Sequence, residues 1–581
     1  MRVGAALAHA LSSLKRPGLV MGVAGTVAVV VALTFFALRP VAVTHAQTPP
    51  TDAPAAEEPV KPPADRSGNG TGSGADLASV APGTLTADDF TQAQTTEPFA
   101  VKLADLVNQN RLGINFTWLL VTGYLVMFMQ AGFALVETGF CRAKSALHVM
   151  MTNFMVYGLG MLAFYCVGFA FAFGGIGQVG VGNLGGLAQL DGEWKVTLGG
   201  VDWRILGHKG FFLTGTGYDV GVAAFFLFQM VFMDTAATIP TGALAERWKW
   251  MGFVVYSIFI GAVIYPVFAN WAWGGGWLSQ LGAHDPGFGV GYIDFAGSGV
   301  VHAIGGFTAL AGALVLGPRI GKFNKDGTAN AIPGHNIILA ALGTFILAFG
   351  WFGFNPGSTF GAAGNGNLRI GMIATVTMLA GASGSLLAMS VTWVQHGKPD
   401  SGMMINGLLA GLVAITAPSG YVSPASAVVI GAIAGVIVVY SVSFIENVMK
   451  VDDPVGAISV HGVCGVWGVL SVGIFADGTA NYGGTQVSGV LFGDWGQLGA
   501  QMIGAAVCMA WAFGSAFVFF KVLMAVGMFR SKPEDEVAGL DIPEMGGLAY
   551  NWDEEFSRGA WPMPTAARGG VMAGGSAGGG G

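Results

Sequence analysis

The feature that most constrains the fold is a series of apolar runs, each long enough to cross a membrane. From Phe116 onward, runs of roughly 20 apolar residues recur, and a helix of about 20 residues spans the bilayer core. We predict eleven spans, near residues 115–137, 147–174, 218–243, 250–272, 297–317, 335–355, 368–393, 402–418, 423–448, 457–476 and 494–527. Only 10% of the 581 residues are charged, against about 25% in soluble domains. The sequence therefore predicts an all-α polytopic membrane protein.

Two segments precede the first span. Residues 1–46 combine Arg2, Lys15 and Arg16 with a following apolar run and a small-residue end, which is typical of a signal peptide. An uncleaved N-terminal anchor is the alternative. Residues 47–110 are rich in Pro, Ala, Thr and Gly, and predict a disordered periplasmic extension with at most a short helix near its end.

Basic residues orient the spans. If the first span starts outside, the connections after odd-numbered spans face the cytoplasm, and these connections hold most Lys and Arg, as the positive-inside rule requires. They include Arg142, Lys144, Arg247, Lys249, Arg319, Lys322, Lys325, Lys398 and Lys450. We predict a membrane domain over 111–529 in the cell inner membrane, with the mature N-terminus outside. A cytoplasmic tail at 530–568 and a Gly-rich disordered end at 569–581 follow.

One pattern occurs in both halves of the membrane domain. Asp294 precedes His302 by eight residues, and Asp453 precedes His461 by eight. His302 lies on span 5 and His461 on span 10, which run in opposite directions, so the pattern predicts an inverted repeat of five plus five spans, plus one. An ionisable residue within a membrane indicates function. We predict that the two imidazoles face each other and share a proton, because no third ligand accompanies them for a metal.

The acidic residues in and beside the apolar runs are expected to differ in role. Asp453 precedes Pro454 and is expected to cap span 10. Asp294 either caps span 5 or helps to attract a cation. Asp234 lies inside span 3, an expensive position whose role stays open. Glu137, near a span end, is expected to be solvated or paired.

Aromatic residues gather at the predicted outer ends of spans 3, 4 and 6. Phe228 and Phe232 lie four residues apart on one helix face, Trp273 ends span 4, and Phe354 and Ser358 close span 6. Aromatic faces bind cations, and a serine hydroxyl can accept a hydrogen bond from the same cation. An interfacial aromatic belt is the alternative, although a belt does not explain the neighbouring glycines.

Over roughly residues 112–550, these features resemble the ammonium transporter (Amt/Mep/Rh) family, on its Amt side and of bacterial type. The matching stretches are Gly242-Ala-Leu-Ala-Glu-Arg247, Trp273-Gly-Gly-Gly276, Asp294-Phe-Ala-Gly, Gly350-Trp-Phe-Gly-Phe-Asn355, Gly357-Ser358, Asp452-Asp-Pro454 and Val460-His-Gly-Val-Cys-Gly465. Trp273 and Ser358 argue against the Rh side. The tail stretch Gly539-Leu540-Asp541 also resembles the family's C-terminal motif.

The resemblance implies a role for each matching residue. These are substrate binding by Phe228, Trp273, Ser358 and Asp294, gating by Phe232 and Phe354, and pore lining by His302, His461 and Trp351. It implies a transporter that recruits ammonium, with methylammonium as an analogue, deprotonates it and conducts ammonia. A sensor that signals through the cytoplasmic tail is the alternative; an enzyme is not expected, because no nucleophile or metal constellation is found.

The resemblance also predicts the partners. It implies a homotrimer in the lipid bilayer and a PII-type regulatory protein at the cytoplasmic face. Met545-Gly546-Gly547 stands where many members have His-Gly-Glu, which weakens the inference of PII control. No cofactor, metal or nucleic acid is expected.

Overall fold

The computed structural model describes residues 87–550, with gaps at 180, 182–183, 365–368 and 479–485. The predicted signal peptide or anchor (1–46) lies outside the described residues. So do residues 47–86 of the predicted extension and residues 551–581, which include the Gly-rich end.

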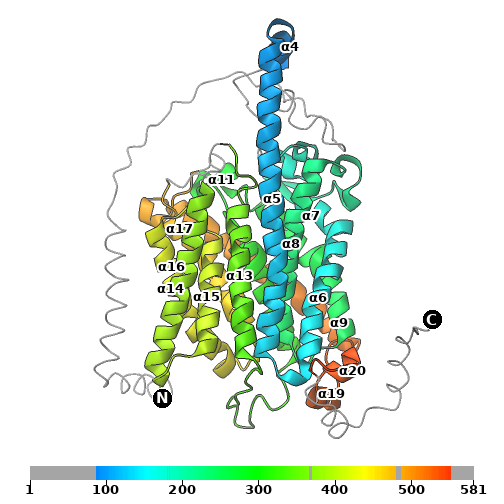
Figure 1. Cartoon of the computed structure of the whole chain (residues 1–581), viewed down its shortest axis with the longest axis vertical. Helices are drawn as coiled ribbons and strands as arrows, with labels where there is room; N and C mark the ends of the chain where they lie inside the picture. Colours follow the sequence, from blue (N-terminus) through cyan, green and yellow to red (C-terminus); the bar gives the residue numbers. More distant parts are fainter. Residues whose placement is uncertain (1–86, 180, 182–183, 365–368, 479–485, 551–581) are drawn as a thin grey trace, which may run out of the picture.

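The described chain is a bundle of long apolar helices that run roughly side by side (Figure 1). Ten helices of the described residues are long and apolar enough to cross a membrane, and α15 is a shorter apolar helix of 16 residues. Together they confirm the predicted all-α architecture with eleven apolar spans. The spans contain α5 (Pro98–Phe140), α6 (Ala146–Ala163), α7 (Phe169–Phe173), α8 (Val220–Leu244), α9 (Trp250–Phe259), α10 (Tyr265–Ala272), α12 (Ile304–Leu316), α13 (Ile337–Gly357), α14 (Ile370–His396), α15 (Ser401–Thr416), α16 (Pro424–Asn447), α17 (Cys464–Phe475) and α18 (Trp495–Ala525).

Short π-helical segments occur in four of these spans, inside two of them and at the start of the other two. They are η2 (Phe164–Gly168), η7 (Ile260–Ile264), η9 (Ser298–Ala303) and η11 (Ile458–Val463). The last two carry the predicted pore histidines. Because π-helical turns often mark functional sites within helices, their placement at both histidines singles out these two spans.

The first span is much longer than predicted. Helix α4 (Ala87–Thr96) leads into α5, which begins at Pro98 and projects beyond the other helices (Figure 1). The predicted disorder is therefore wrong for residues 87–98, whereas the short helix expected near residues 99–110 is present as the first part of α5. The Pro-rich composition of the preceding segment does not extend past Pro98, which occupies the first helical turn, where proline is tolerated. Helix-forming residues without a further Gly or Pro follow as far as Leu112.

Glycines allow the helices to approach closely. A Cβ atom on Gly384 of α14 would lie 2.4 Å from the carbonyl oxygen of Gly407 on α15. A Cβ atom on Gly435 of α16 would lie 2.2 Å from the carbonyl oxygen of Gly384. Small residues serve this purpose in membranes, where packing rather than the hydrophobic effect drives association. The abundance of 94 glycines therefore reflects the close packing of these helices.

The two ends of the bundle differ. A β-hairpin of β1 (Glu193–Leu198) and β2 (Val201–Gly207) lies in the long connection after α7, with Gly199 and Gly200 at its turn in the left-handed conformation that tight hairpins require. At the end opposite the projecting part of α5 lie α19 (Pro533–Ala538) and α20 (Asp541–Met545) of the tail (Figure 1).

Candidate functional site

Asp294 caps the π-helical segment that carries His302. Its carboxylate accepts hydrogen bonds from the backbone N–H groups of Gly297, Gly299 and Val300, each at 2.9 Å. Gly297 has a φ of 111°, a conformation that favours glycine. The N–H group of His302 donates a hydrogen bond of 3.0 Å to the carbonyl oxygen of Gly297, five residues earlier in the chain. This i→i−5 bond is the π-helical bond that places His302 within the bundle.

Asp453 builds the second half in the same way. Its carboxylate accepts from the N–H groups of Val455, Gly456 and Ile458 at 3.3, 3.0 and 2.7 Å. Gly456 again has a positive φ, of 81°, and a π-helical segment with His461 follows. The expected helix cap is thus present at Asp453, and the structure shows the same cap at Asp294.

The two halves meet at the histidines. Gly306 of α12 lies against η11, where an added Cβ would be only 2.1 Å from the backbone nitrogen of Gly462. This close crossing brings Nδ1 of His302 to 3.1 Å from Nδ1 of His461, with nearly parallel rings. Both side chains are buried. Only one proton can lie between two Nδ1 atoms, so one ring donates while the other accepts.

A stack of aromatic rings leads to the histidine pair. Phe228 lies 4.6 Å from Phe232, and Phe232 stacks on Phe354 at 4.1 Å between ring centroids. Trp273 meets the edge of Phe232 at 6.2 Å, and Phe354 lies 5.4 Å from the ring of His302. The predicted gate residues are therefore adjacent, and they separate the outer aromatics from His302.

Backbone contacts fix the outer aromatic residues. The indole nitrogen of Trp273 donates to the backbone carbonyl of Asp294 at 2.6 Å. Asp294 thus reaches the aromatic site through its carbonyl, while its carboxylate caps the helix. The hydroxyl of Ser358 donates to the carbonyl of Phe354 at 2.8 Å. A hydroxyl that donates in this way presents lone pairs to a further group.

The sequence predicted Trp351 in the pore but not the residue that holds it. Trp351 stacks on His302 at 5.3 Å, and its indole nitrogen donates to Oγ1 of Thr416 at 2.9 Å. On the far side of the pair, Phe133 lies 5.8 Å from the ring of His461. Phe133 was missed because an apolar residue within an apolar span carries no local signal of function; its position one helical turn before Glu137 was the available signal.

Beyond His461 lies a small buried cavity. Its volume of about 20 Å³ is lined by Phe133, Glu137, Ile239, Asn406, Val455 and His461, among other residues. A site of about 10–15 Å³ holds one water molecule. Glu137 was expected to be solvated or paired, but it is buried and accepts hydrogen bonds from neutral groups only.

Asp234 lies apart from this site. It is 2% exposed, and its Oδ1 has no hydrogen-bond partner among the described residues. It lies two positions after Phe232, so it projects from a different side of α8 than the predicted gate residue.

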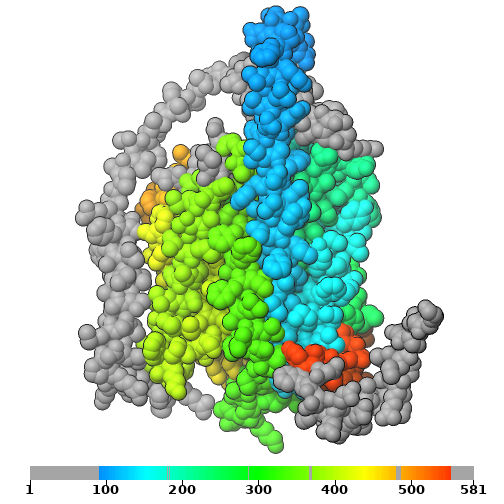
Figure 2. All heavy atoms as spheres, in the orientation of Figure 1, coloured from blue at the N-terminus to red at the C-terminus, as the bar shows by residue number. Residues whose placement is uncertain are grey.

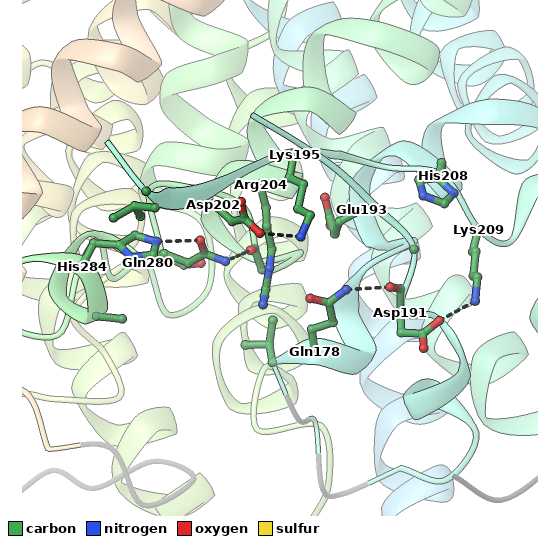
Figure 3. Close-up of a pocket in the computed structure, with 17 residues that line it drawn as sticks. Gln178, Asp191, Glu193, Lys195, Asp202, Arg204, His208, Lys209, Gln280 and His284 are labelled. Atoms are coloured by element: carbon green, nitrogen blue, oxygen red, sulfur yellow. Dashed lines mark hydrogen bonds and ion pairs between the residues drawn. The ribbon is translucent and has the colours of Figure 1, made fainter. Parts of the chain in front are cut away.

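A second cavity lies beside the β-hairpin, away from the histidine pair, with a volume of about 1140 Å³ (Figure 3). Lys195 and Arg204 are cross-strand neighbours and share one face of the hairpin. The ion pairs of Lys195 with Asp202 and of Lys209 with Asp191 occupy the cavity wall (Figure 3). Most of its charges are therefore compensated within the protein.

Glu193 joins this cavity to the turn that carries Trp273. Its Oε1 accepts from Nδ2 of Asn270 at 2.8 Å. The backbone carbonyl of Asn270 in turn accepts from the N–H groups of Gly274 and Gly276 at 3.0 and 2.9 Å. Burial raises the pKa of the Glu193 carboxyl to about 7, against the opposing effect of the Asn270 hydrogen bond.

Comparisons with known proteins cover most of the chain. The model of the Ammonium Transporter Family matches residues 117–550. The ammonium transporter Amt2 of Archaeoglobus fulgidus is 48% identical over 458 residues, which make up 77% of this chain and 90% of that protein. The ammonium transporter 1 member 3 of Solanum lycopersicum is 36% identical, over 76% of this chain and 94% of that protein.

Solved structures agree with these relatives. A protein described as a sensor Amt protein is 38% identical, with a TM-score of 0.64 over 75% of this chain and 98% of its own. Mep2 of Candida albicans is 28% identical, with a TM-score of 0.61 over 73% of this chain and 87% of its own. Relatives of this kind are named as transporters and not as enzymes. The chain is therefore a multi-pass membrane protein that belongs to the ammonium transporter family, on its Amt side.

Proposed function

We propose that this protein recruits ammonium at the outer aromatic site, removes one proton and conducts ammonia along the histidine pair. The unbroken order of rings from Phe232 and Phe354 to His302 and His461 supports this function most directly. These rings connect the proposed cation-binding site at the outer aromatic residues to the buried histidine pair, whose polar atoms are the imidazole nitrogens.

Recruitment is assigned to Phe228, Trp273 and Ser358. The two rings offer their faces to a cation, and the Ser358 oxygen offers a lone pair to an N–H of ammonium. Asp294 holds Trp273 in place through its carbonyl. Because the site is built from neutral groups, it binds a small cation without placing a fixed carboxylate beside it.

Deprotonation is assigned to the level of the gate. An isolated charge in a medium as apolar as the Phe232–Phe354 stack costs on the order of tens of kcal/mol. Neutral ammonia avoids most of this cost. Nε2 of His302 is buried without a hydrogen-bond partner among the described residues, and it therefore offers a site for the proton or for the passing ammonia.

The histidine pair can move a proton by exchanging tautomers. When Nδ1 of His302 donates to Nδ1 of His461, Nε2 of His302 is bare and Nε2 of His461 carries a hydrogen. A proton added at His302 Nε2 shifts the bridging proton to His461 and releases one from His461 Nε2. Proton and ammonia can then cross separately.

We also propose that the protein lies in the cell inner membrane, with its C-terminal tail in the cytoplasm. Residues 111–529 form the proposed transport domain, and residues 530–568 form the tail. Tail residues contact the end of the bundle that carries the basic connections: Asp541 accepts from the N–H groups of Leu147 and His148 at 3.1 and 2.9 Å. This docked tail is the proposed contact for a PII-type regulatory protein, which co-purification with the intact and the tail-truncated chain tests.

A homotrimer is proposed from the apolar surface. Helices α5 and α13 lie side by side on one face of the protein (Figure 2). Both carry exposed aromatic side chains, such as Tyr124 and Phe128 on α5 and Phe345 and Phe349 on α13. Lipid or a second subunit covers such side chains in a membrane. Light scattering of the purified protein distinguishes three chains from one.

The sensor alternative is favoured by one observation, the 38% identity to a protein described as a sensor. Uptake of labelled methylammonium by proteoliposomes that contain the purified protein separates the two functions. We expect uptake above that of protein-free liposomes, with competition by ammonium. Ammonium binding without uptake would instead assign the chain as a sensor.

A further inference from the structure

The buried carboxyl group of Glu137 has no assigned role in the proposed transport path. Glu137 is 3% exposed and lies within one turn of the inner end of α5. Its Oε2 accepts from Nδ2 of Asn153 at 2.7 Å, and Oγ1 of Thr241 lies 2.6 Å from Oε2 and 2.8 Å from Oε1. Among the described residues, Glu137 forms no ion pair. A buried carboxylate without a counter-ion is costly, so a structural role alone is a poor reason for it.

The surroundings of Glu137 point toward the histidine pair. The cavity of about 20 Å³ has Glu137, Asn406 and His461 among its walls, and the remaining lining is mostly apolar. Its size suits one water molecule, and a buried water requires two to four polar partners, as a rule of about three. These three side chains supply them. A single water can therefore join the imidazole of His461 to the carboxyl group of Glu137.

The position of this cavity completes a sequence of groups through the protein. His302 faces the gate, since it contacts Trp351 and Phe354, whereas His461 contacts Phe133 on the cavity side. The order from the outside is thus gate, His302, His461, cavity and Glu137. No other Asp or Glu lines this cavity.

We infer that Glu137 accepts the proton that leaves the histidine pair, through a water molecule in the cavity. This inference rests on the proposed function. Ammonium gives its proton to Nε2 of His302 and becomes ammonia. The proton on Nδ1 of His302 passes to Nδ1 of His461, the hydrogen on Nε2 of His461 passes to the water, and the water passes one of its own protons to the Glu137 carboxylate. One proton enters and one is stored, so the step balances.

The polar surroundings of Glu137 suit both of its charge states. The Asn153 amide donates to the ionised form, and the Thr241 hydroxyl can donate to a carboxylate or accept from a carboxylic acid. Thr238, which donates to Oδ1 of Asn153 at 2.7 Å, continues this neutral network. Because no cation fixes the carboxylate in its ionised state, the group can take up and release a proton.

The test uses Glu137→Gln in proteoliposomes that contain the full chain. The amide keeps the size and one acceptor oxygen but cannot bind the proton. We expect the ammonium-driven current to fall about a hundredfold or more, within the range of a positioned proton-transfer group. Conduction driven by an ammonia gradient, read as internal alkalinisation, should stay within about twofold of wild type, because the apolar path is intact.

Two further variants separate a relay from a structural role. Glu137→Asp keeps a carboxyl group and should recover part of the current. Glu446→Gln, which removes the partner of Lys322 at the cytoplasmic end, serves as the matched control and should carry wild-type current. A wild-type current in Glu137→Gln would overturn the inference, as would equal loss of current and ammonia conduction. If wild type itself shows neither, the proposed function fails instead.

Discussion

The two halves of the protein build the same local structure and then surround it differently. Asp294 and Asp453 each cap a π-helical segment with three backbone hydrogen bonds, and each is followed by a glycine of positive φ and by a histidine. The neighbours are not alike. His302 lies among Trp351 and Phe354, whereas His461 lies beside Phe133 and the cavity.

This difference shows which properties each half contributes. The shared cap and π-turn fix where each imidazole stands, and they follow from a repeated sequence pattern. The neighbours decide what each imidazole contacts: His302 lies beside the predicted gate rings, and His461 lies beside a water-sized, mostly apolar cavity that has Glu137 and Asn406 in its wall. The two halves thus place two similar imidazoles in two different environments, a difference that the proposed one-way proton transfer would use.

Removal of the caps has the largest expected effect. Asp294→Ala and Asp453→Ala should each lower stability by about 2 kcal/mol or more, because three buried N–H groups lose their acceptor. Thermal unfolding in detergent measures this loss. Methylammonium uptake should fall further in Asp294→Ala, because the same backbone positions Trp273.

A matched control is Asp400→Ala, which removes a cap from the exposed start of α15. Its expected cost is about 1 kcal/mol or less. Equal costs at Asp400, Asp294 and Asp453 would contradict the view that the buried caps hold the histidine segments.

The smallest expected effect concerns the β-hairpin, where Glu193 is hydrogen-bonded to Asn270 near the turn that carries Trp273. The pKa of Glu193 is raised from 4.5 to about 7 by burial. The folded state therefore binds more protons than the unfolded state between these values, and stability falls as the pH rises from about 4.5 to 7.

Glu193→Gln removes this titration. The variant should match wild type near pH 4.5 and be more stable near pH 8, by a modest amount because the side chain is part-exposed. Unfolding temperatures at the two pH values provide the measurement. A pH dependence identical to that of wild type would contradict the raised pKa of Glu193.

Much of the fold could be predicted from the sequence because membranes restrict the choices. Apolar runs of sufficient length must be helices, and the paired Asp and His residues indicated an inverted repeat. The positions of Phe232, Phe354, His302 and His461 followed from the same pattern and from the family resemblance. The caps at Asp294 and Asp453 were also among the expected alternatives.

What could not be predicted depends on contacts between distant segments. The π-turns, the indole bond from Trp351 to Thr416 and the cavity beside Glu137 arise from helix crossings that no local pattern specifies. The extent of α5 was not predicted because the Pro-rich composition that indicates disorder ends at Pro98. The polarity of the sequence does not change markedly at that point, so the start of the helix is not marked.

The central claim is that the two imidazoles act together as the path for the transported group. The most direct measurement is ammonium-driven current and methylammonium uptake in one set of proteoliposomes that contain the double variant His302→Ala, His461→Ala. An unchanged elution volume and unfolding temperature would show that the fold is intact. We predict that current and uptake are both abolished. Wild-type uptake by the double variant would contradict the account.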